Sequence, residues 1–316
     1  MSGERSFVLG QYGEEKTSAF LQLIGWFPRH SNISIPCINK EHRNLKDAEK
    51  RSHGEDVIYA TQNNFNPRYM DVMHIQVKNQ DSYPKKSDLK NKIYKAFHEL
   101  DNTIQCAKSN QDIVSYIKRA RGSLFIPKLN HIGLLVMVSE NVQDGKINLL
   151  DELEEYDSPR GLESNMLLVD QMQINFILDS IGVAKILYKN AIIQYFCTST
   201  TLSLSQRLEK STKEMPYSYL TSGCLPIKIQ QENKQGLVLF VNDNFTEENF
   251  ERYINRGLSF LNGWGIFLNI GFRNYEMHKH NKIVADVLTL YKDRLTTYEI
   301  SAFCSNPIDV VRNQHD

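Results

Sequence analysis

The sequence predicts an α/β (α+β) protein of two domains, with residues 1–145 forming the first and residues 146–316 forming the second. Three observations support this prediction. Short apolar runs rich in β-branched residues alternate with longer stretches of helical periodicity. A chain of 316 residues is long enough for two domains of ordinary size. The acidic stretch DGKINLLDELEEYDSPRG separates the two halves, as expected of a domain boundary.

The sequence of the first half predicts a mixed sheet with flanking helices. Gly25 follows an apolar helical pattern and is expected to stop it, and Ser87-Asp88 is expected to cap a long helix. The predicted elements, in order, are a helix over 14–26, an edge strand within 33–38, strands over 56–60 and 72–78, helices over 89–107 and 112–119, and a strand over 133–139.

In the second half, the sequence predicts that strands mostly alternate with helices and that few strands pair as hairpins. Thr246 is expected to cap one of its helices. The predicted elements are helices over 166–189 and 247–261 and strands over 191–197, 225–229, 236–242 and 264–272.

Composition and charge exclude several classes of protein. The chain is 41% hydrophobic and 10% aromatic, which excludes wholesale disorder. Lys and Arg number 37 and so do Asp and Glu, which argues against a polybasic protein held to nucleic acid by bulk charge. The balance is uneven, because residues 1–145 hold 20 basic against 16 acidic residues, leaving 17 against 21 for residues 146–316. A nucleic-acid partner is therefore expected on the first half.

Cysteine usage and hydropathy indicate the compartment. The five cysteines are scattered and form no CxxC pair, a pattern typical of a reducing cytosol, and it makes a zinc site unexpected. Neither an apolar window of transmembrane length nor a signal-peptide core is visible. We expect a cytoplasmic protein without membrane contact.

A group of polar residues in the first half has the composition of a metal site. Gln76 and Lys78 lie two apart on a predicted strand and so share a face. If the two strands pair as a hairpin, Asp56 comes beside them, and Glu14 at the start of the packed helix adds a second carboxylate. Mg²⁺ prefers such oxygen ligands. The predicted ligands are Asp56, the side-chain oxygen of Gln76, the main-chain carbonyl of Val77, and Glu14, with Lys78 stabilising charge on a phosphate.

Alternatives remain for several positions. Asp71 competes with Asp56 as the metal-binding acid, and Glu15 with Glu14, while His74 shares the face of Lys78. Lysines at the start of the following helix are either phosphate contacts or a solvated face. These are Lys85, Lys86, Lys90, Lys92 and Lys95, of which the first three are the predicted nucleic-acid-binding residues.

HGED followed by IQVK, behind a helix opening GE…GW, resembles the PD-(D/E)xK, or restriction-endonuclease-like, nuclease superfamily. The chain is most similar to its Mrr-type and Holliday-resolvase-like branches, in which E-x-K is often Q-x-K. The resemblance covers roughly residues 8–140 and implies an αβββαβ core that cleaves DNA with Mg²⁺ (or Mn²⁺). It implies that Asp56 is the metal-binding acid, Gln76 the second ligand, Lys78 the catalytic lysine and Glu14 the helix-borne acid.

The functional hypothesis is a Mg²⁺-dependent DNA endonuclease whose C-terminal α/β domain serves oligomerisation or partner binding. The resemblance extends to effector nucleases of bacterial restriction and antiphage systems, which often work with an ATPase or helicase partner. The sequence holds no GxxxxGK[ST] loop, so ATP dependence would come from that partner. Cleavage of two strands favours a homo-oligomer. RNA is an alternative substrate, and a non-catalytic subunit that binds nucleic acid or protein is the rival hypothesis.

Overall fold

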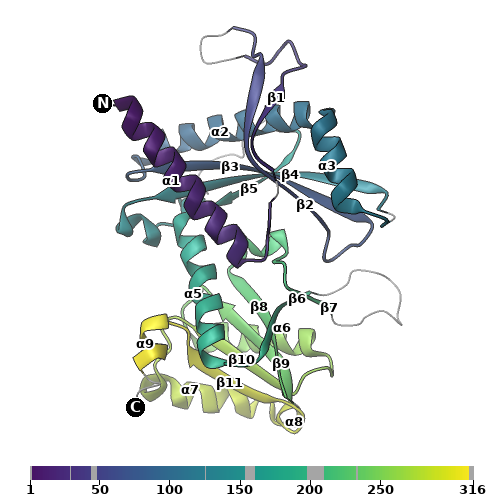
Figure 1. Cartoon of the computed structure of the whole chain (residues 1–316). Helices are drawn as coiled ribbons and strands as arrows, with labels where there is room; N and C mark the ends of the chain where they lie inside the picture. Colours follow the sequence, from purple (N-terminus) through teal and green to yellow (C-terminus); the bar gives the residue numbers. More distant parts are fainter. Residues whose placement is uncertain are drawn as a thin grey trace. The chain divides into compact units, whose positions relative to one another are not determined.

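The computed structural model describes residues 2–28, 30–43, 48–124, 126–153, 161–197, 210–232 and 234–312. The chain divides into two compact units, Met1–Ile174 (unit 1) and Asn175–Asp316 (unit 2) (Figure 1). The division falls further along the chain than the boundary expected after residue 145. The reason is a strand that follows the acidic stretch and still pairs with the sheet of unit 1.

Unit 1 is built on a five-stranded mixed sheet in the order β1-β2-β3-β4-β5. The first three strands run antiparallel, with Val57 opposite Ile75, and the last three run parallel. The predicted hairpin is therefore present, with both of its strands longer than expected. The strands are β1 (His30–Pro36), β2 (Ser52–Gln62), β3 (Tyr69–Gln80), β4 (Lys128–Ser139) and β5 (Asn165–Val169).

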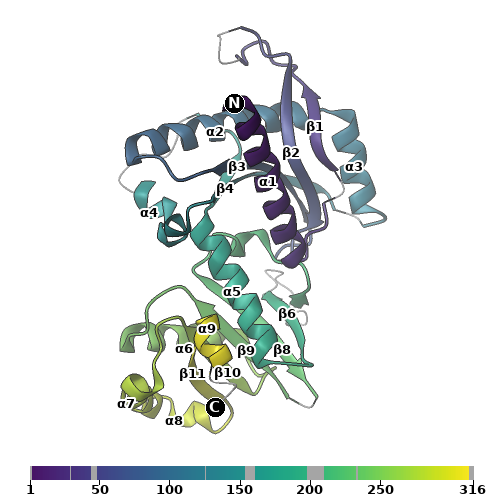
Figure 2. The same ribbon diagram turned by 60° about the vertical axis from the view of Figure 1, so that its left-hand side comes forward.

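Helices cover both faces of this sheet (Figures 1 and 2). Helix α1 (Ser2–Leu23) packs on the face that carries Asn79, because Gly13 lies against that side chain. Helix α2 (Lys86–Ala107) packs on the opposite face, where Phe97 meets Met137 of β4. The part of unit 1 that the structure describes also forms α3 (Gln111–Arg121), η1 (Val142–Lys146) and α4 (Leu149–Leu153). The element order confirms the expected αβββαβ core.

The start expected for the first helix, at Glu14, is wrong, because α1 begins at Ser2 and Glu14 lies in its second half. Two further helix boundaries can be compared with the structure. Gly25 follows α1 with a φ of 88°, a conformation that glycine adopts without strain, so the expected stop is confirmed. The cap expected at Ser87-Asp88 is wrong, because both residues lie in the first turn of α2. The N-cap position is Lys85, which makes no side-chain capping hydrogen bond. Asp88 in the first turn still complements the helix dipole.

Unit 2 is a second mixed sheet in the order β11-β10-β9-β8-β6-β7, in which β9, β10 and β11 are parallel. Helix α6 (Glu247–Leu261) has the predicted bounds, and its N-cap Thr246 accepts a hydrogen bond from the Asn249 amide over 3.1 Å. The strands are β6 (Ile192–Cys197), β7 (Lys210–Thr212), β8 (Cys224–Gln231), β9 (Lys234–Val241), β10 (Phe267–Phe272) and β11 (Glu299–Cys304). The described residues of this unit also form η3 (Tyr217–Tyr219), α7 (Met277–Thr289), α8 (Lys292–Leu295) and α9 (Pro307–Arg312).

The helix expected over 166–189 is correct only in part. Its first residues form β5, and helix α5 (Gln171–Leu187) begins after Asp170. The Asp170 carboxylate accepts a hydrogen bond from the Gln173 amide over 2.8 Å, as an N-cap residue does.

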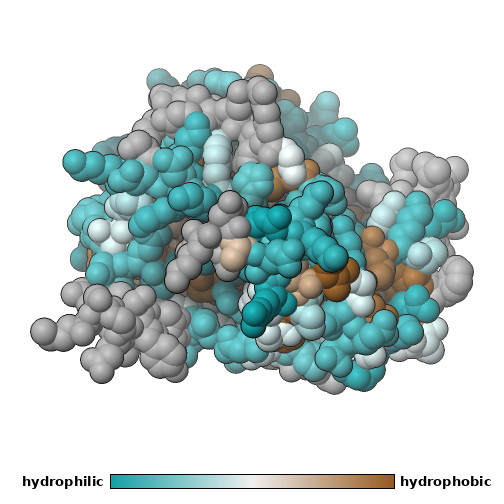
Figure 3. Space-filling model, turned by 90° about the horizontal axis from the view of Figure 1, so that it is seen from above, coloured by the Kyte–Doolittle hydropathy of each residue, from teal (hydrophilic) through white to brown (hydrophobic). Residues whose placement is uncertain are grey.

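The described helices include none with the length and apolar character needed to span a membrane. The face of the molecule in Figure 3 shows mostly hydrophilic side chains with scattered hydrophobic ones.

Candidate active site

The end of the β2–β3 ladder brings Asp56 next to β3. Cα pairing between these strands reaches Val57 and Ile75, and Asp56 comes immediately before it in β2. The Asp56 carboxylate accepts a hydrogen bond from the Val77 amide over 2.8 Å. In an extended strand, the N–H and C=O of one residue point to the same side, so the Val77 carbonyl also faces the Asp56 side of β3.

The groups around Asp56 shift the pKa of its carboxyl in both directions. Burial raises the pKa of its carboxyl above the ordinary value, and the neighbouring carboxylates of Glu14 and Glu55 raise it further. The Val77 amide and the Lys78 ammonium act in the opposite direction and lower this pKa. Glu14 and Lys78 are therefore both near enough to act on Asp56. Buried or half-buried carboxylates that repel one another are typical of a site that binds a cation.

Gln76 and Lys78 project together toward α2, as the strand alternation predicts. In the amide orientation that satisfies both of its polar atoms, the Gln76 nitrogen donates to the Ala96 carbonyl over 3.2 Å. Its oxygen then accepts from Lys78 Nζ over 3.2 Å. The same Nζ lies 4.0 Å from Glu99 Oε2 of α2. Glu99 was not singled out by the sequence, because only the packing of α2 on the sheet brings it to the lysine.

Glu14 is held against the sheet by the close packing of α1. A Cβ added at Gly13 would lie 2.5 Å from the Cβ of Asn79, so only glycine permits this approach. Glu14 Oε2 accepts a hydrogen bond from Asn32 Nδ2 of β1 over 3.3 Å. Two residues further along α1, Lys16 forms an ion pair of 3.1 Å with Glu140, which follows β4. Glu14 is half-buried, whereas the alternative Glu15 is exposed.

The other two alternatives form internal hydrogen bonds instead of joining this group. Asp71 is buried near the start of β3, about 23 Å along the strand from Lys78. Its carboxylate accepts hydrogen bonds from Asn63 and Asn130, over 2.7 Å and 3.0 Å. His74 is fully buried, with Nδ1 3.0 Å from the Glu55 carboxylate and Nε2 2.9 Å from His131 Nδ1. Both residues therefore belong to internal hydrogen-bond networks.

A cleft of about 290 Å³ extends from Lys78 along the middle of α2. It is lined by Lys78, Asn79, Gln80, Lys92, Lys95, Ala96, Glu99 and Met137. Of the lysines expected to bind nucleic acid, Lys85 takes the N-cap position of α2, and Lys90 lies over the ring of Tyr94 at 5.3 Å. The Lys86 side chain lies outside the described part of the structure. The cleft is thus lined by the next two lysines of the same run.

The αβββαβ core, with an acid on the second strand, Q-x-K on the third and an acid on the first helix, defines the class of PD-(D/E)xK nucleases. Comparison with protein families agrees: residues 1–173 match the family described as the GAPS4 protein PD-(D/E)XK nuclease domain. The chain belongs to this family, so it contains a nuclease-type hydrolase domain of the kind found in antiphage systems. The matched region is nearly coextensive with unit 1. No curated protein matches the chain.

Proposed function

We propose that unit 1 is a Mg²⁺-dependent endonuclease that hydrolyses phosphodiester bonds of DNA, as the effector of an antiphage or restriction system. The observation that carries this proposal is the position of Asp56. Its carboxylate accepts a hydrogen bond from the Val77 amide. It also interacts electrostatically with Glu14 of α1 and with Lys78 of β3. An acid flanked by a second acid and a lysine supplies the groups that phosphodiester hydrolysis needs.

The oxygens near Asp56 suit a divalent cation. PD-(D/E)XK nucleases generally use such ions, and Mg²⁺ is held by hard oxygen ligands together with water. We infer that Asp56, Glu14, the Gln76 side-chain oxygen and the Val77 carbonyl hold it. Burial and the two neighbouring carboxylates disfavour the charge on Asp56, and a cation would relieve this repulsion. Once bound, the ion polarises the phosphate and lowers the pKa of water.

The remaining residues orient the substrate and neutralise its charge. Lys78 Nζ is held between the Gln76 oxygen and the Glu99 carboxylate. From there the ammonium can stabilise the negative charge that develops on the phosphate. Lys92 and Lys95, which line the adjoining cleft, are placed to contact neighbouring phosphates.

Plasmid cleavage in the presence of Mg²⁺ tests the proposal. Asp56→Asn and Lys78→Ala should each lower the cleavage rate by about 100-fold or more, the usual effect of removing a charge-stabilising group. Glu14→Gln and Glu15→Gln form a matched pair on α1, of which only the first should impair cleavage. Wild-type rates for both Asp56→Asn and Lys78→Ala would refute the site. Parallel assays on DNA and RNA, with Mg²⁺ or Mn²⁺, define the substrate and the ion.

The rival function is a non-catalytic subunit with a nuclease fold. The observation in its favour is Gln76, whose neutral amide replaces a carboxylate and weakens the attraction for a cation. This function predicts no Mg²⁺-dependent cleavage by the wild type, together with retained binding of nucleic acid or protein.

Partners of the enzyme are part of the proposal. One site per chain favours a homo-oligomer for cleavage of both strands, and we assign oligomerisation or docking of an ATPase partner to unit 2. Light scattering and co-purification with neighbouring gene products measure these two properties.

A further inference from the structure

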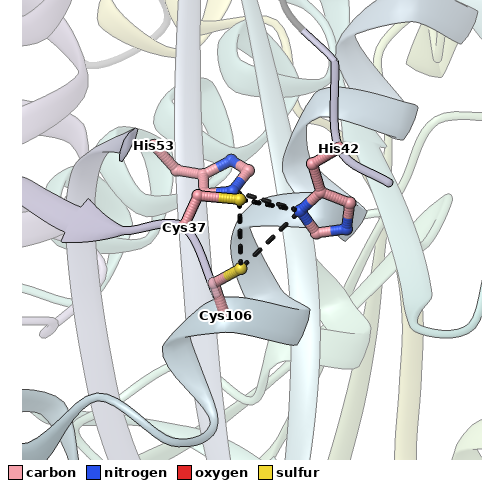
Figure 4. Close-up of side chains that lie close together, drawn as sticks. All are labelled: Cys37, His42, His53 and Cys106. Carbon is pink, nitrogen blue, oxygen red and sulfur yellow. Dashed lines mark hydrogen bonds between the residues drawn. The ribbon is translucent and has the colours of Figure 1, made fainter. Parts of the chain in front are cut away.

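Two cysteines and two histidines from distant parts of the sequence meet in unit 1 (Figure 4). Cys37 follows β1, His42 lies in the β1–β2 connection, His53 belongs to β2, and Cys106 lies in the last turn of α2. Their ligand atoms all lie within 4.8 Å of one another. Only Cys37 is partly exposed, and the other three side chains are buried.

Several polar groups of the cluster converge on one nitrogen atom. His42 Nδ1 lies 3.4 Å from Cys37 Sγ, 3.6 Å from Cys106 Sγ and 3.3 Å from His53 Nε2. A ring nitrogen offers either one proton or one lone pair, so it can satisfy one of these partners at a time. Three polar groups are thus directed at the same nitrogen, although the Cys37 thiol also donates to the Asn39 carbonyl over 3.3 Å. An atom at the centre of the four would satisfy all of them at once.

Four of the six spacings between these ligand atoms match those around a tetrahedral zinc ion. Zn–S distances near 2.3 Å and Zn–N distances near 2.0–2.1 Å place two sulfurs about 3.8 Å apart, sulfur and nitrogen about 3.6 Å apart, and two nitrogens about 3.4 Å apart. The sulfurs of Cys37 and Cys106 lie 3.9 Å apart. The two sulfur–nitrogen distances to His42 are 3.4 Å and 3.6 Å, and the nitrogen–nitrogen distance to His53 is 3.3 Å. Four edges of the tetrahedron therefore agree with zinc coordination to within about 0.2 Å.

We propose that Cys37, His42, His53 and Cys106 bind a structural Zn²⁺. Two thiolates with two imidazoles in tetrahedral geometry select zinc over the oxygen-preferring Mg²⁺. Four protein ligands leave no open position for substrate, which distinguishes a structural site from a catalytic one. His42 Nε2 lies 3.2 Å from the side-chain oxygen of Gln105, and Gln105 donates in turn to Asp101 over 3.2 Å. Such outer contacts orient a histidine ligand.

The zinc site would fasten the β1–β2 connection and β2 to the end of α2. His53 precedes Asp56 by three residues on β2, and Cys106 follows Glu99 by two helical turns on α2. The ion therefore links the two elements that carry Asp56 and the partner of Lys78. Zinc binding rests on the four ligands alone and does not depend on the proposed nuclease activity.

Metal analysis of the purified full-length protein tests the proposal. Mass spectrometry of elements should find about one zinc per chain in the wild type. Cys37→Ser, Cys106→Ser and His53→Ala should each reduce it to less than about a tenth of that value. Cys304→Ser is the matched control, because this half-buried thiol belongs to unit 2 and lies outside the cluster. It should keep the wild-type zinc content.

A second measurement on the wild type remains informative if the variants fail to fold. Replacement of the zinc by Co²⁺ should give the absorption bands of tetrahedral thiolate-bound cobalt. Chemical modification of the cluster thiols should release zinc in proportion to the number of thiols modified. Three results would overturn the proposal: a wild type that holds no zinc even after reconstitution, a Cys37–Cys106 disulfide in the freshly purified protein, or zinc retained in full by Cys37→Ser and Cys106→Ser.

Discussion

Replacing Gly13 by alanine tests whether the close approach of α1 to β3 sets the position of Glu14. Gly13 has no side chain, and the Cβ of Asn79 occupies the space that one would fill. Glu14 is the next residue of the helix, so a displacement at position 13 is transmitted to its carboxylate. The substitution alters no charge and removes no polar group. Its effect therefore reports on position alone.

The expected magnitude follows from the contact. An added Cβ lies 2.5 Å from Asn79 Cβ, whereas carbon atoms in contact settle at about 3.5–4.0 Å, so the two elements must separate by about 1 Å. Overpacking of this kind costs about 1–3 kcal/mol, and alanine recovers about 1 kcal/mol of helix propensity over glycine. The free energy of unfolding should fall by only about 0–2 kcal/mol. A misplacement of about 1 Å can lower the reaction rate on the order of 100-fold.

Cleavage rates and urea denaturation measured on the same preparations separate the two effects. Gly182→Ala in α5 is the matched control, because no atom lies within 4 Å of the added Cβ. It should raise stability by about 0.5–1 kcal/mol and leave cleavage unchanged. Adding Asn79→Gly to Gly13→Ala removes the obstructing Cβ and should restore part of the rate. A wild-type cleavage rate in Gly13→Ala would refute the reasoning.

Three further predictions concern pH, salt and the two units. Burial, and then His74 and Lys108, lower the pKa of His131 to about 4, so the unfolded chain binds a proton that the folded one does not. The free energy of unfolding should therefore fall as pH drops from about 6.5 to 4, and urea titrations should show a smaller fall in His131→Gln. Lys92→Ala and Lys95→Ala should each make the slope of log K for DNA binding against log salt concentration shallower by about one unit. Anisotropy titrations measure this slope, and Lys118→Ala on α3 should leave it unchanged. Phe272→Ala in the core of unit 2 should cost about 3–5 kcal/mol, and calorimetry should show only one of two transitions shifted if the units fold independently.

The sequence predicted the elements whose signals are local. Helix α6 has the expected bounds because Thr246 caps it and its apolar residues recur at helical spacing. The predicted helix over 166–189 was wrong at its start, because the apolar run NMLLV has no periodicity that separates a strand from a helix. Asp170 was the visible signal, since it is a cap residue placed after that run.

Residues that meet only through packing were harder to predict. Asp56, Gln76 and Lys78 could be grouped because a single hairpin carries them. Glu99 and Cys106 belong to α2, and their partners Lys78 and Cys37 lie more than twenty residues earlier in the sequence. The cysteines were therefore interpreted as scattered, although Cys37, His42 and His53 fall within one short basic segment. That local concentration of metal-binding side chains was the available clue.

The place of β3 in its sheet has a consequence for biosynthesis. Its pairing with β2 is a local hairpin, which can form as soon as residue 80 has left the ribosome, whereas its pairing with β4 waits for residues 128–139. Asp56, Gln76 and Lys78 are thus assembled early, but Glu99 is added only when α2 docks on the sheet. A nascent chain that has made only the hairpin holds an incomplete site. On the proposed mechanism, a cell that synthesises this protein is exposed to nuclease activity only after unit 1 has folded completely.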